Sequence, residues 1–245
     1  MQIITTATAK GGTGKTATAA ALAQAAAYRG RRVLAVDLDP QANLTFTLDA
    51  DPTAAGSDLL LSGLDPAELI QKNASGIDVI AANIGLTIEK SSPGSARRLQ
   101  TALVPIKDSY DLIIIDTPTT PGNELQYNAL QAATGLIVPL MADAYGVQSL
   151  YQITRTARQI QSASNPDLQI LGFILTQHNS RSTIARQMQE AITERAAAIG
   201  VPYLGAIRKA VALQEAAALQ TSLFEYAPNS NPAKDYLMLF DALKI

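Results

Sequence analysis

The 245-residue sequence predicts an α/β protein with three layers, in which helices cover both faces of a mostly parallel, twisted central sheet. Short, continuous apolar runs alternate along the chain with longer helical stretches, which is the order of parallel β-α-β units. Hydrophobic residues make up 47% of the chain, enough to bury a sheet of this kind on both sides. We therefore expect a single domain over residues 1–245.

The expected strands are the apolar runs, two of which end in an aspartate. They cover residues 3–7, 33–37, 77–81, 111–116, 135–140, 168–176 and 203–207. The run at 111–116 is the strongest of them, because three isoleucines follow a leucine before Asp116.

The expected helices lie between these strands. They cover residues 16–28, 94–106, 123–133, 145–164, 182–199, 211–219 and 232–244. Gly30 is expected to end the first helix, Asn123 to cap the third, and Arg97 and Arg98 to be exposed on the second. Residues 38–45 are expected to form a loop, because Pro40 disfavours helix at Asp39, and residues 50–76 to form short helical pieces between turns.

A glycine loop, residues 10–16 (KGGTGKT), separates the first predicted strand from the first predicted helix. Glycines at positions 11, 12 and 14 allow backbone conformations in which successive N–H groups point at phosphate oxygens. The helix that follows adds the positive end of its dipole. Lys15 is expected to reach the β- and γ-phosphates, and Thr16 to bind Mg²⁺. The nucleotide-binding residues expected in this segment are Lys10, Gly11, Gly12, Thr13, Gly14, Lys15, Thr16 and Ala17. A glycine turn without a ligand would not require a lysine and a hydroxyl directly before a helix.

Three acids, Asp37, Asp39 and Asp116, lie at or just after the ends of predicted strands. Ligands of parallel sheets gather at this edge, and an acid that ends a buried strand is costly unless it meets a cation or a metal. We therefore expect Thr16, Asp39 and Asp116 to form the metal site. The alternatives are a helix-capping or turn role for Asp116, and for Asp39 the first position of a turn before Pro40.

The pattern K-G-G-x-G-K-T resembles the deviant Walker A motif of the ParA/MinD family of P-loop ATPases. Ala9 stands where the plain motif has glycine, and Lys10 matches the signature lysine that in this family reaches the nucleotide of a second subunit. Asp37 to Gln41 resembles the first switch segment, which implies that Asp39 orients the attacking water and Asp37 supports the metal region. Asp116-Thr117-Pro118 resembles the second switch, which would extend to Gly122. The resemblance implies a P-loop fold, ATP/ADP and Mg²⁺ as ligands, and Lys10, Lys15 and Asp39 as catalytic residues.

The resemblance extends more loosely to the C-terminal half of the chain. It implies adenine contacts by Thr176, Gln177, Ile207 and Arg208, although each could equally be an ordinary residue at a strand end. Residues 207–216 align with the family segment that runs from the adenine pocket into a helix.

The first functional expectation is a partition ATPase that moves plasmid, chromosomal or mobile-element DNA. The resemblance implies an ATP-dependent homodimer, nonspecific DNA binding and a ParB-like centromere-binding partner. Ala212 occupies a position that is often arginine in relatives, and the basic candidates can also be read as solvated helix faces. The candidate DNA-binding residues are Arg155, Arg158, Arg181, Arg186, Arg208 and Lys209. The alternatives are a MinD-like ATPase acting at the membrane and a P-loop biosynthetic enzyme.

Composition narrows the function classes. With 19 basic and 21 acidic residues, the net charge of the chain does not favour binding to nucleic acid. A local patch of basic residues on the surface is still compatible with these numbers. The lack of cysteine excludes disulfides, a thiolate nucleophile and a cysteine-ligated iron–sulfur cluster within the chain, and a single histidine, His178, disfavours a zinc site. We see no signal peptide, no membrane-spanning run and no N-terminal DNA-binding domain, and expect a cytoplasmic protein that associates with the nucleoid if it binds DNA.

Overall fold

The computed structural model describes residues 1–83, 86, 95–120 and 123–244. Within these residues the chain forms an eight-stranded sheet with the order β3-β4-β2-β5-β1-β6-β7-β8. All neighbouring strands are parallel except β3 and β4. The strands are β1 (Gln2–Thr6), β2 (Val33–Asp37), β3 (Gln71–Lys72), β4 (Ile77–Ile80), β5 (Leu112–Asp116), β6 (Gly135–Leu140), β7 (Gln169–His178) and β8 (Tyr203–Arg208).

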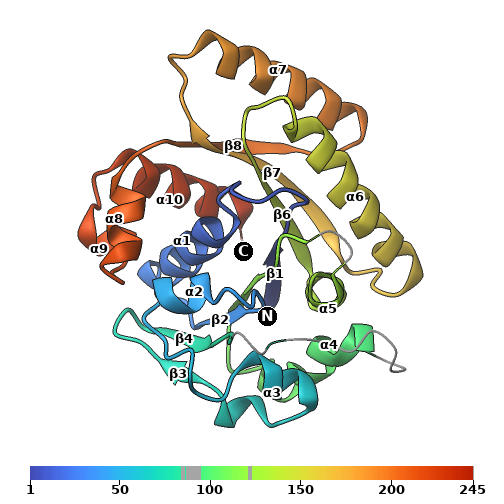
Figure 1. Cartoon of the computed structure of the whole chain (residues 1–245), viewed down its shortest axis with the longest axis vertical. Helices are drawn as coiled ribbons and strands as arrows, with labels where there is room; N and C mark the ends of the chain where they lie inside the picture. Colours follow the sequence, from blue (N-terminus) through green and yellow to red (C-terminus); the bar gives the residue numbers. More distant parts are fainter. Residues whose placement is uncertain (84–85, 87–94, 121–122, 245) are drawn as a thin grey trace.

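The helices form two layers, one on each face of the sheet (Figure 1). One face is covered by α3 (Ser57–Ser62), α4 (Arg98–Ala102), α5 (Glu124–Ala132), α6 (Gly146–Ala163) and α7 (Thr183–Ala198). The other face is covered by α1 (Lys15–Tyr28), α2 (Asn43–Thr47), α8 (Ala212–Ala218), α9 (Leu223–Tyr226) and α10 (Asn231–Leu243). The predicted three-layer α/β/α architecture is therefore confirmed.

The alternation of strand side chains divides the core into two parts. In β1, Ile3 packs with the helices of the first face and Ile4 with those of the second. The same division holds in β2, where Leu34 and Val36 belong to the first part and Ala35 to the second. Because every residue of β2 and β5 is buried, both strands read as continuous apolar runs in the sequence.

The predicted second helix, residues 94–106, is wrong as a continuous element. Gly94 lies outside the described residues, and the rest forms a 3₁₀ turn (Ser95–Arg97), α4 and a second 3₁₀ turn (Val104–Ile106). Pro105 explains the break, because it lacks an N–H and disfavours helical backbone at the residue before it. Arg97 is exposed as predicted, whereas Arg98 is partly buried.

The predicted loop at 38–45 ends earlier than expected, because α2 begins at Asn43. The Asp37 carboxylate accepts hydrogen bonds from the Thr45 N–H at 2.9 Å and the Thr45 hydroxyl at 2.8 Å, which ties this short helix to the end of β2. Asn123 caps α5 as predicted, accepting from the Leu125 N–H, and Gly30 follows α1 with a φ of 76°. Neither β3 nor α9 was predicted.

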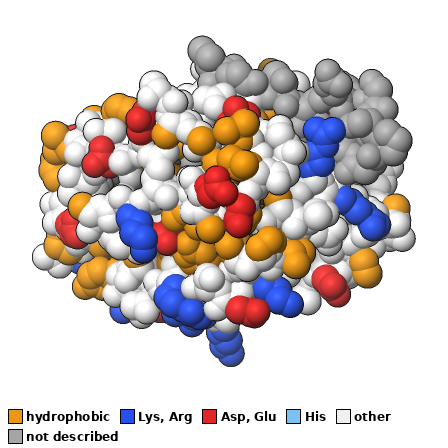
Figure 2. Space-filling model, turned by 90° about the horizontal axis from the view of Figure 1, so that it is seen from below, with side chains coloured by type: hydrophobic (Ala, Val, Ile, Leu, Met, Phe, Trp, Pro, Cys, Tyr) orange, Lys and Arg blue, Asp and Glu red, His pale blue; other side chains and the backbone are white. Residues whose placement is uncertain are grey.

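Seen from below, the end of the molecule that carries α3 and β3 presents apolar side chains among acidic and basic ones (Figure 2). A cavity of about 780 Å³ lies at this end between α3 and α4, and its lining contains none of the predicted site residues. Among the described residues, no helix combines the length and apolar character needed to cross a bilayer.

Candidate nucleotide site

The glycine loop connects the end of β1 to the start of α1. Gly12 and Gly14 have φ angles of 75° and 77°, in the left-handed region that favours glycine. Gly14 caps α1 without a side-chain hydrogen bond, and the first turn of the helix carries no acid. Within the described residues, the N–H groups of Gly14 to Ala17 donate no hydrogen bond to the protein. Four free donors and the positive helix end make this a site for an anion.

Lys15, Thr16 and Asp116 meet beside the free N–H groups. The Lys15 Nζ lies 2.9 Å from Asp116 Oδ1, and the Thr16 hydroxyl donates to Asp116 Oδ2 at 2.6 Å. Side chains of Lys15 and Asp116 are 4% and 0% exposed, so each charge depends on the other for compensation. The sequence predicted these residues as phosphate and metal ligands, and the structure brings them together.

Asp37 and Asp116 are paired in register on neighbouring strands, and both are buried. Burial, together with the nearby charge of Asp116, raises the pKa of Asp37 to about 7. Besides its bonds to Thr45, the Asp37 carboxylate accepts from the Asp39 N–H at 3.0 Å. Asp37 therefore organises the segment that carries Asp39.

Asp39 lies at the same edge, with its Oδ2 3.8 Å from the Lys15 Nζ. Its Oδ1 accepts from the Gln41 N–H at 3.1 Å, which orients the carboxylate. In the part of the chain that the structure describes, no group of three or more His, Cys, Asp or Glu side chains could hold a metal ion. The two carboxylates and the Thr16 hydroxyl at this edge are a donor set that suits Mg²⁺, which proteins usually hold through one or two carboxylates together with substrate phosphates and water. Of the expected second switch, Thr117 donates to the Thr6 carbonyl at 3.0 Å, and Gly122 lies outside the described residues.

Two of the four residues predicted to contact adenine lie against the glycine loop. The Thr176 hydroxyl donates to the Thr13 carbonyl at 2.6 Å, and the Gln177 Nε2 donates to the Gly12 carbonyl at 3.3 Å. The other two have different contacts: Ile207 packs in the core, and Arg208 binds Asp235 of α10. Asp235 accepts from the Arg208 backbone N–H at 2.9 Å and from its guanidinium at 2.6 Å.

Sequence reasoning missed two residues that contact Lys10. Its Nζ lies 2.5 Å from Asp143 Oδ2 and 5.0 Å from the centroid of the Tyr145 ring. Asp143 follows the end of β6, as Asp39 follows the end of β2. The rule that selected acids beyond parallel strands would therefore have found Asp143 as well.

Comparisons with known proteins agree with this geometry. A family model described as an AAA domain matches residues 1–170. The sporulation initiation inhibitor protein Soj of Bacillus subtilis is 35% identical over 246 residues, covering 97% of this chain and 96% of that protein. The chain belongs to the ParA/MinD family of P-loop ATPases. The chromosome-partitioning ATPase Soj of Thermus thermophilus is 34% identical, and the match covers 94% of this chain and 90% of that protein.

A solved structure of the same architecture carries the corresponding ligands. The cobyrinic acid a,c-diamide synthase from Mycobacterium smegmatis, with bound ADP and magnesium, has a TM-score of 0.85 and 31% identity. The match covers 100% of this chain and 94% of that one. The ParA/MinD architecture is thus shared by proteins with different substrates, and the function of this ATPase has to be argued from its own residues.

The contacts of Asp235 predict that it stabilises the fold. Asp235→Ala is expected to lower the free energy of unfolding by about 2–3 kcal/mol, because it leaves the Arg208 N–H without its acceptor and removes a buried carboxylate paired with a cation. Urea unfolding followed by circular dichroism measures this. The matched control is Asp241→Ala, whose ion pair with Arg29 is exposed on both sides and should be silent. Equal stability of the two variants would contradict the structural role.

Proposed function

We propose that this chain is a ParA-like partition ATPase that binds ATP with Mg²⁺, dimerises, and hydrolyses ATP slowly until a partner stimulates it. The observation that carries the proposal is the meeting of Lys15, Thr16 and Asp116 beside four free N–H groups at the start of α1. Identity of about 35% to Soj over nearly the whole chain supports the partition role. Residues 1–245 would act as one ATPase domain in the cytoplasm.

Each residue of the site has a task in phosphoryl transfer to water. The N–H groups of Gly14 to Ala17 bind phosphate oxygens, and Lys15 exchanges the Asp116 carboxylate for the β- and γ-phosphates. Thr16 and Asp116, with Asp39 at the same edge, would hold Mg²⁺, which supplies charge neutralisation when bound. Asp39 orients the attacking water. Thr176 and Gln177 support the glycine loop on the side where the adenine is expected.

Dimerisation and partner binding complete the cycle. Lys10 would contact the nucleotide of a second subunit, so that ATP joins two copies face to face. A ParB-like centromere-binding protein would then stimulate hydrolysis and separate them. Support for this step comes from the signature lysine of the family and from the partly exposed position of Lys10.

The structure separates the basic residues proposed for DNA binding by their contacts. Arg208 is held by Asp235, Arg158 donates to the Ile199 carbonyl, and Arg186 lies 3.5 Å from the Thr183 hydroxyl. Arg181 and Lys209 are exposed, and within the described residues neither side chain has an acidic partner. Both line a polar cavity of about 430 Å³ together with His178, Asn179, Ser180, Arg208 and Asn231.

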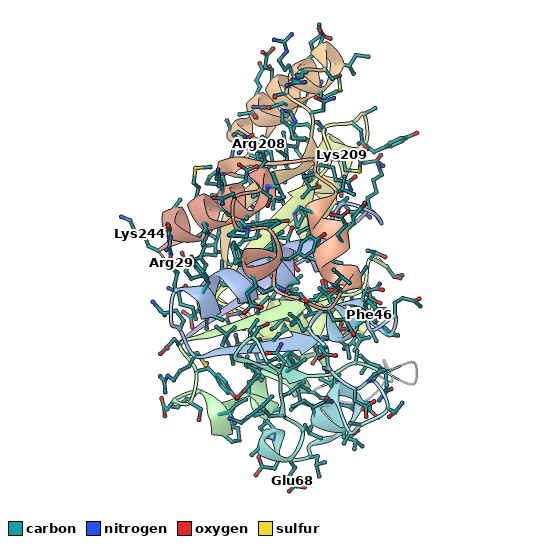
Figure 3. All side chains as sticks on the ribbon, turned by 90° about the vertical axis from the view of Figure 1, so that its left-hand side faces the viewer. Arg29, Phe46, Glu68, Arg208, Lys209 and Lys244 are labelled. Atoms are coloured by element: carbon teal, nitrogen blue, oxygen red, sulfur yellow. The ribbon has the colours of Figure 1, made fainter. Side chains whose placement is uncertain are left out.

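This cavity favours contact with the DNA backbone. Figure 3 shows Lys209 next to Arg208 at the end of β8, well away from Glu68 at the other end of the molecule. Phosphate contacts by Arg181 and Lys209 would give nonspecific binding that weakens with salt, as partition on a nucleoid requires. The arginine that relatives often carry at position 212 would thus be replaced by charges on neighbouring loops.

Two other functions fit parts of the site. The structural likeness to a cobyrinic acid a,c-diamide synthase supports a P-loop biosynthetic enzyme, whose ATP turnover would depend on a small molecule. A MinD-like function would need a free amphipathic helix at the membrane. The apolar side of α10, with Tyr236, Leu239 and Phe240, packs on the sheet instead, so we place this alternative lower.

The glycine loop assignment predicts that Lys15→Ala abolishes nucleotide binding. The variant loses the cation that compensates the phosphates, and we expect ATP affinity to fall by at least ~100-fold, measured by titration calorimetry. Lys72→Ala on β3, which removes an exposed lysine, is the control and should bind normally. Tight ATP binding by Lys15→Ala would rule out the assigned role of the loop.

The proposed role of Asp39 predicts that its substitution affects ATP hydrolysis but not ATP binding. Asp39→Ala should keep ATP binding but lower the hydrolysis rate by about 10²-fold or more, because the water loses its orienting carboxylate. Phosphate release and gel filtration with ATP measure turnover and the trapped dimer. Glu68→Ala, an exposed acid at the far end of the molecule (Figure 3), should hydrolyse ATP at the normal rate. Unchanged turnover in Asp39→Ala would remove Asp39 from the mechanism.

The DNA proposal predicts binding only with ATP. In a fluorescence titration over a range of salt, the wild type should bind duplex DNA with ATP but not with ADP. The double variant Arg181→Ala/Lys209→Ala should bind more weakly and lose about 0.9 of log–log salt slope for each phosphate contact removed. The control with the same charge change, Lys72→Ala/Lys107→Ala, should retain the slope. A normal slope in the first variant would displace the DNA site from this cavity.

A further inference from the structure

The ammonium group of Lys10 is bound by its own subunit rather than free in solution. Asp143 Oδ2 lies 2.5 Å from Nζ, and the Tyr145 ring lies under the same nitrogen with its centroid at 5.0 Å. An ion pair and a cation–π contact therefore act together on one charge. Both partners come from the segment between β6 and α6, far from Lys10 along the chain.

The segment that holds Lys10 is itself well ordered by hydrogen bonds. Asp143 Oδ1 accepts from the Tyr145 N–H at 2.9 Å, and the Asp143 carbonyl accepts from the Gly146 N–H at 3.1 Å. A Cβ on Gly146 would lie 2.8 Å from the Met141 carbonyl oxygen, so this turn is closely packed. One carboxylate oxygen of Asp143 thus shapes the turn, and the other is left for Lys10.

Thr8, two residues before Lys10, is anchored to helices α5 and α6. Thr8 and Ser149 on α6 share a hydrogen bond of 3.0 Å between their hydroxyls, and Gln126 donates to the Thr8 carbonyl at 3.3 Å. The backbone is thus held both at the Asp143 turn and just before Lys10. Lys10 can therefore leave Asp143 through rotation of its side chain, without movement of either backbone segment.

The ion pair of Lys10 with Asp143 breaks more easily than the ion pair of Lys15, the other lysine of the glycine loop, with Asp116. Side chains of Lys10 and Asp143 are 35% and 31% exposed, and Tyr145 is exposed as well. A cavity of about 300 Å³ opens beside them, lined by Ala9, Lys10, Tyr145, Gln148, Ser149 and Gln152. A partly exposed ion pair contributes little to stability. In a buried pair such as Lys15 with Asp116, loss of one partner leaves the other charge buried and uncompensated, which is strongly destabilising.

We propose that Asp143 and Tyr145 are positioning residues that hold Lys10 on its own subunit and release it when a second copy closes over bound ATP. The proposal rests on the ATP-dependent dimer proposed above. On closure Lys10 exchanges one anion, the Asp143 carboxylate, for another, a phosphate of the partner's nucleotide. In each of the two subunits, Lys10 must leave Asp143 before the dimer forms. The free energy needed for this step therefore raises the protein concentration at which ATP causes dimerisation.

The test uses Asp143→Asn, which keeps the oxygen that accepts from the Tyr145 N–H and removes the charge. With ATP, the variant should dimerise at about tenfold lower protein concentration than the wild type, because two weak contacts no longer oppose closure. Light scattering over a concentration series measures the midpoint. With ADP, and without nucleotide, the variant should remain monomeric like the wild type, and its thermal unfolding should be unchanged.

Three further variants make the result specific. Tyr145→Ala should also lower the midpoint, whereas Tyr145→Phe, which retains the ring, should match the wild type. Asp241→Asn removes an exposed ion pair of the same length, with Arg29, beyond the opposite end of α1 from the glycine loop (Figure 3). This control should leave the midpoint unchanged.

Each other outcome overturns the proposal in a recognisable way. An unchanged or higher midpoint in Asp143→Asn, beside normal dimerisation of the wild type, would show that Asp143 does not restrain Lys10. Tighter ATP binding by the monomeric variant would show that Lys10 acts on the nucleotide of its own subunit. If the wild type forms no dimer with ATP at any concentration, the proposed function itself fails.

Discussion

A buried carboxylate that must be compensated determines the arrangement of this site. Asp116 has no exposed surface and lies in register with a second buried acid, Asp37, whose pKa it helps to raise. Two like charges at the edge of one sheet are tolerated only where cations and donors face them. Lys15 and Thr16 meet that requirement from the glycine loop. When ATP and Mg²⁺ bind, the metal ion would compensate the Asp116 carboxylate and the phosphates would compensate Lys15, so neither buried charge is left without a partner.

The two lysines of the glycine loop differ in burial, and the difference divides their tasks. Lys15 faces the interior and is bound to a carboxylate with no access to solvent. Lys10 faces outward and is bound to Asp143, where water screens the pair. A buried lysine is suited to a permanent place at the phosphates of its own subunit. A partly exposed lysine with a local partner is suited to a contact that forms and breaks during a cycle.

Two expectations about secondary structure were wrong, a continuous helix at 94–106 and a loop that extends to residue 45. The segment at 94–106 has helical periodicity, but Pro105 breaks it into short pieces. Residues 43–47 lack a strong helical signal, and the carboxylate of Asp37, at the end of the preceding strand, stabilises that turn. The family resemblance implies an adenine contact for Arg208, which stays a prediction; in the structure its guanidinium pairs with Asp235 on α10. In each of these last two cases the deciding partner lies outside the segment itself.

The sequence by itself determined the α/β architecture, the glycine loop and the acids at the strand ends. Strand periodicity, glycine conformation and the cost of burying a charge are properties of a few neighbouring residues, and they can be read locally. Only the tertiary structure decided which charges meet. The pairs Lys10–Asp143 and Arg208–Asp235 join segments that the topology of the sheet brings together, and no local pattern encodes that distance.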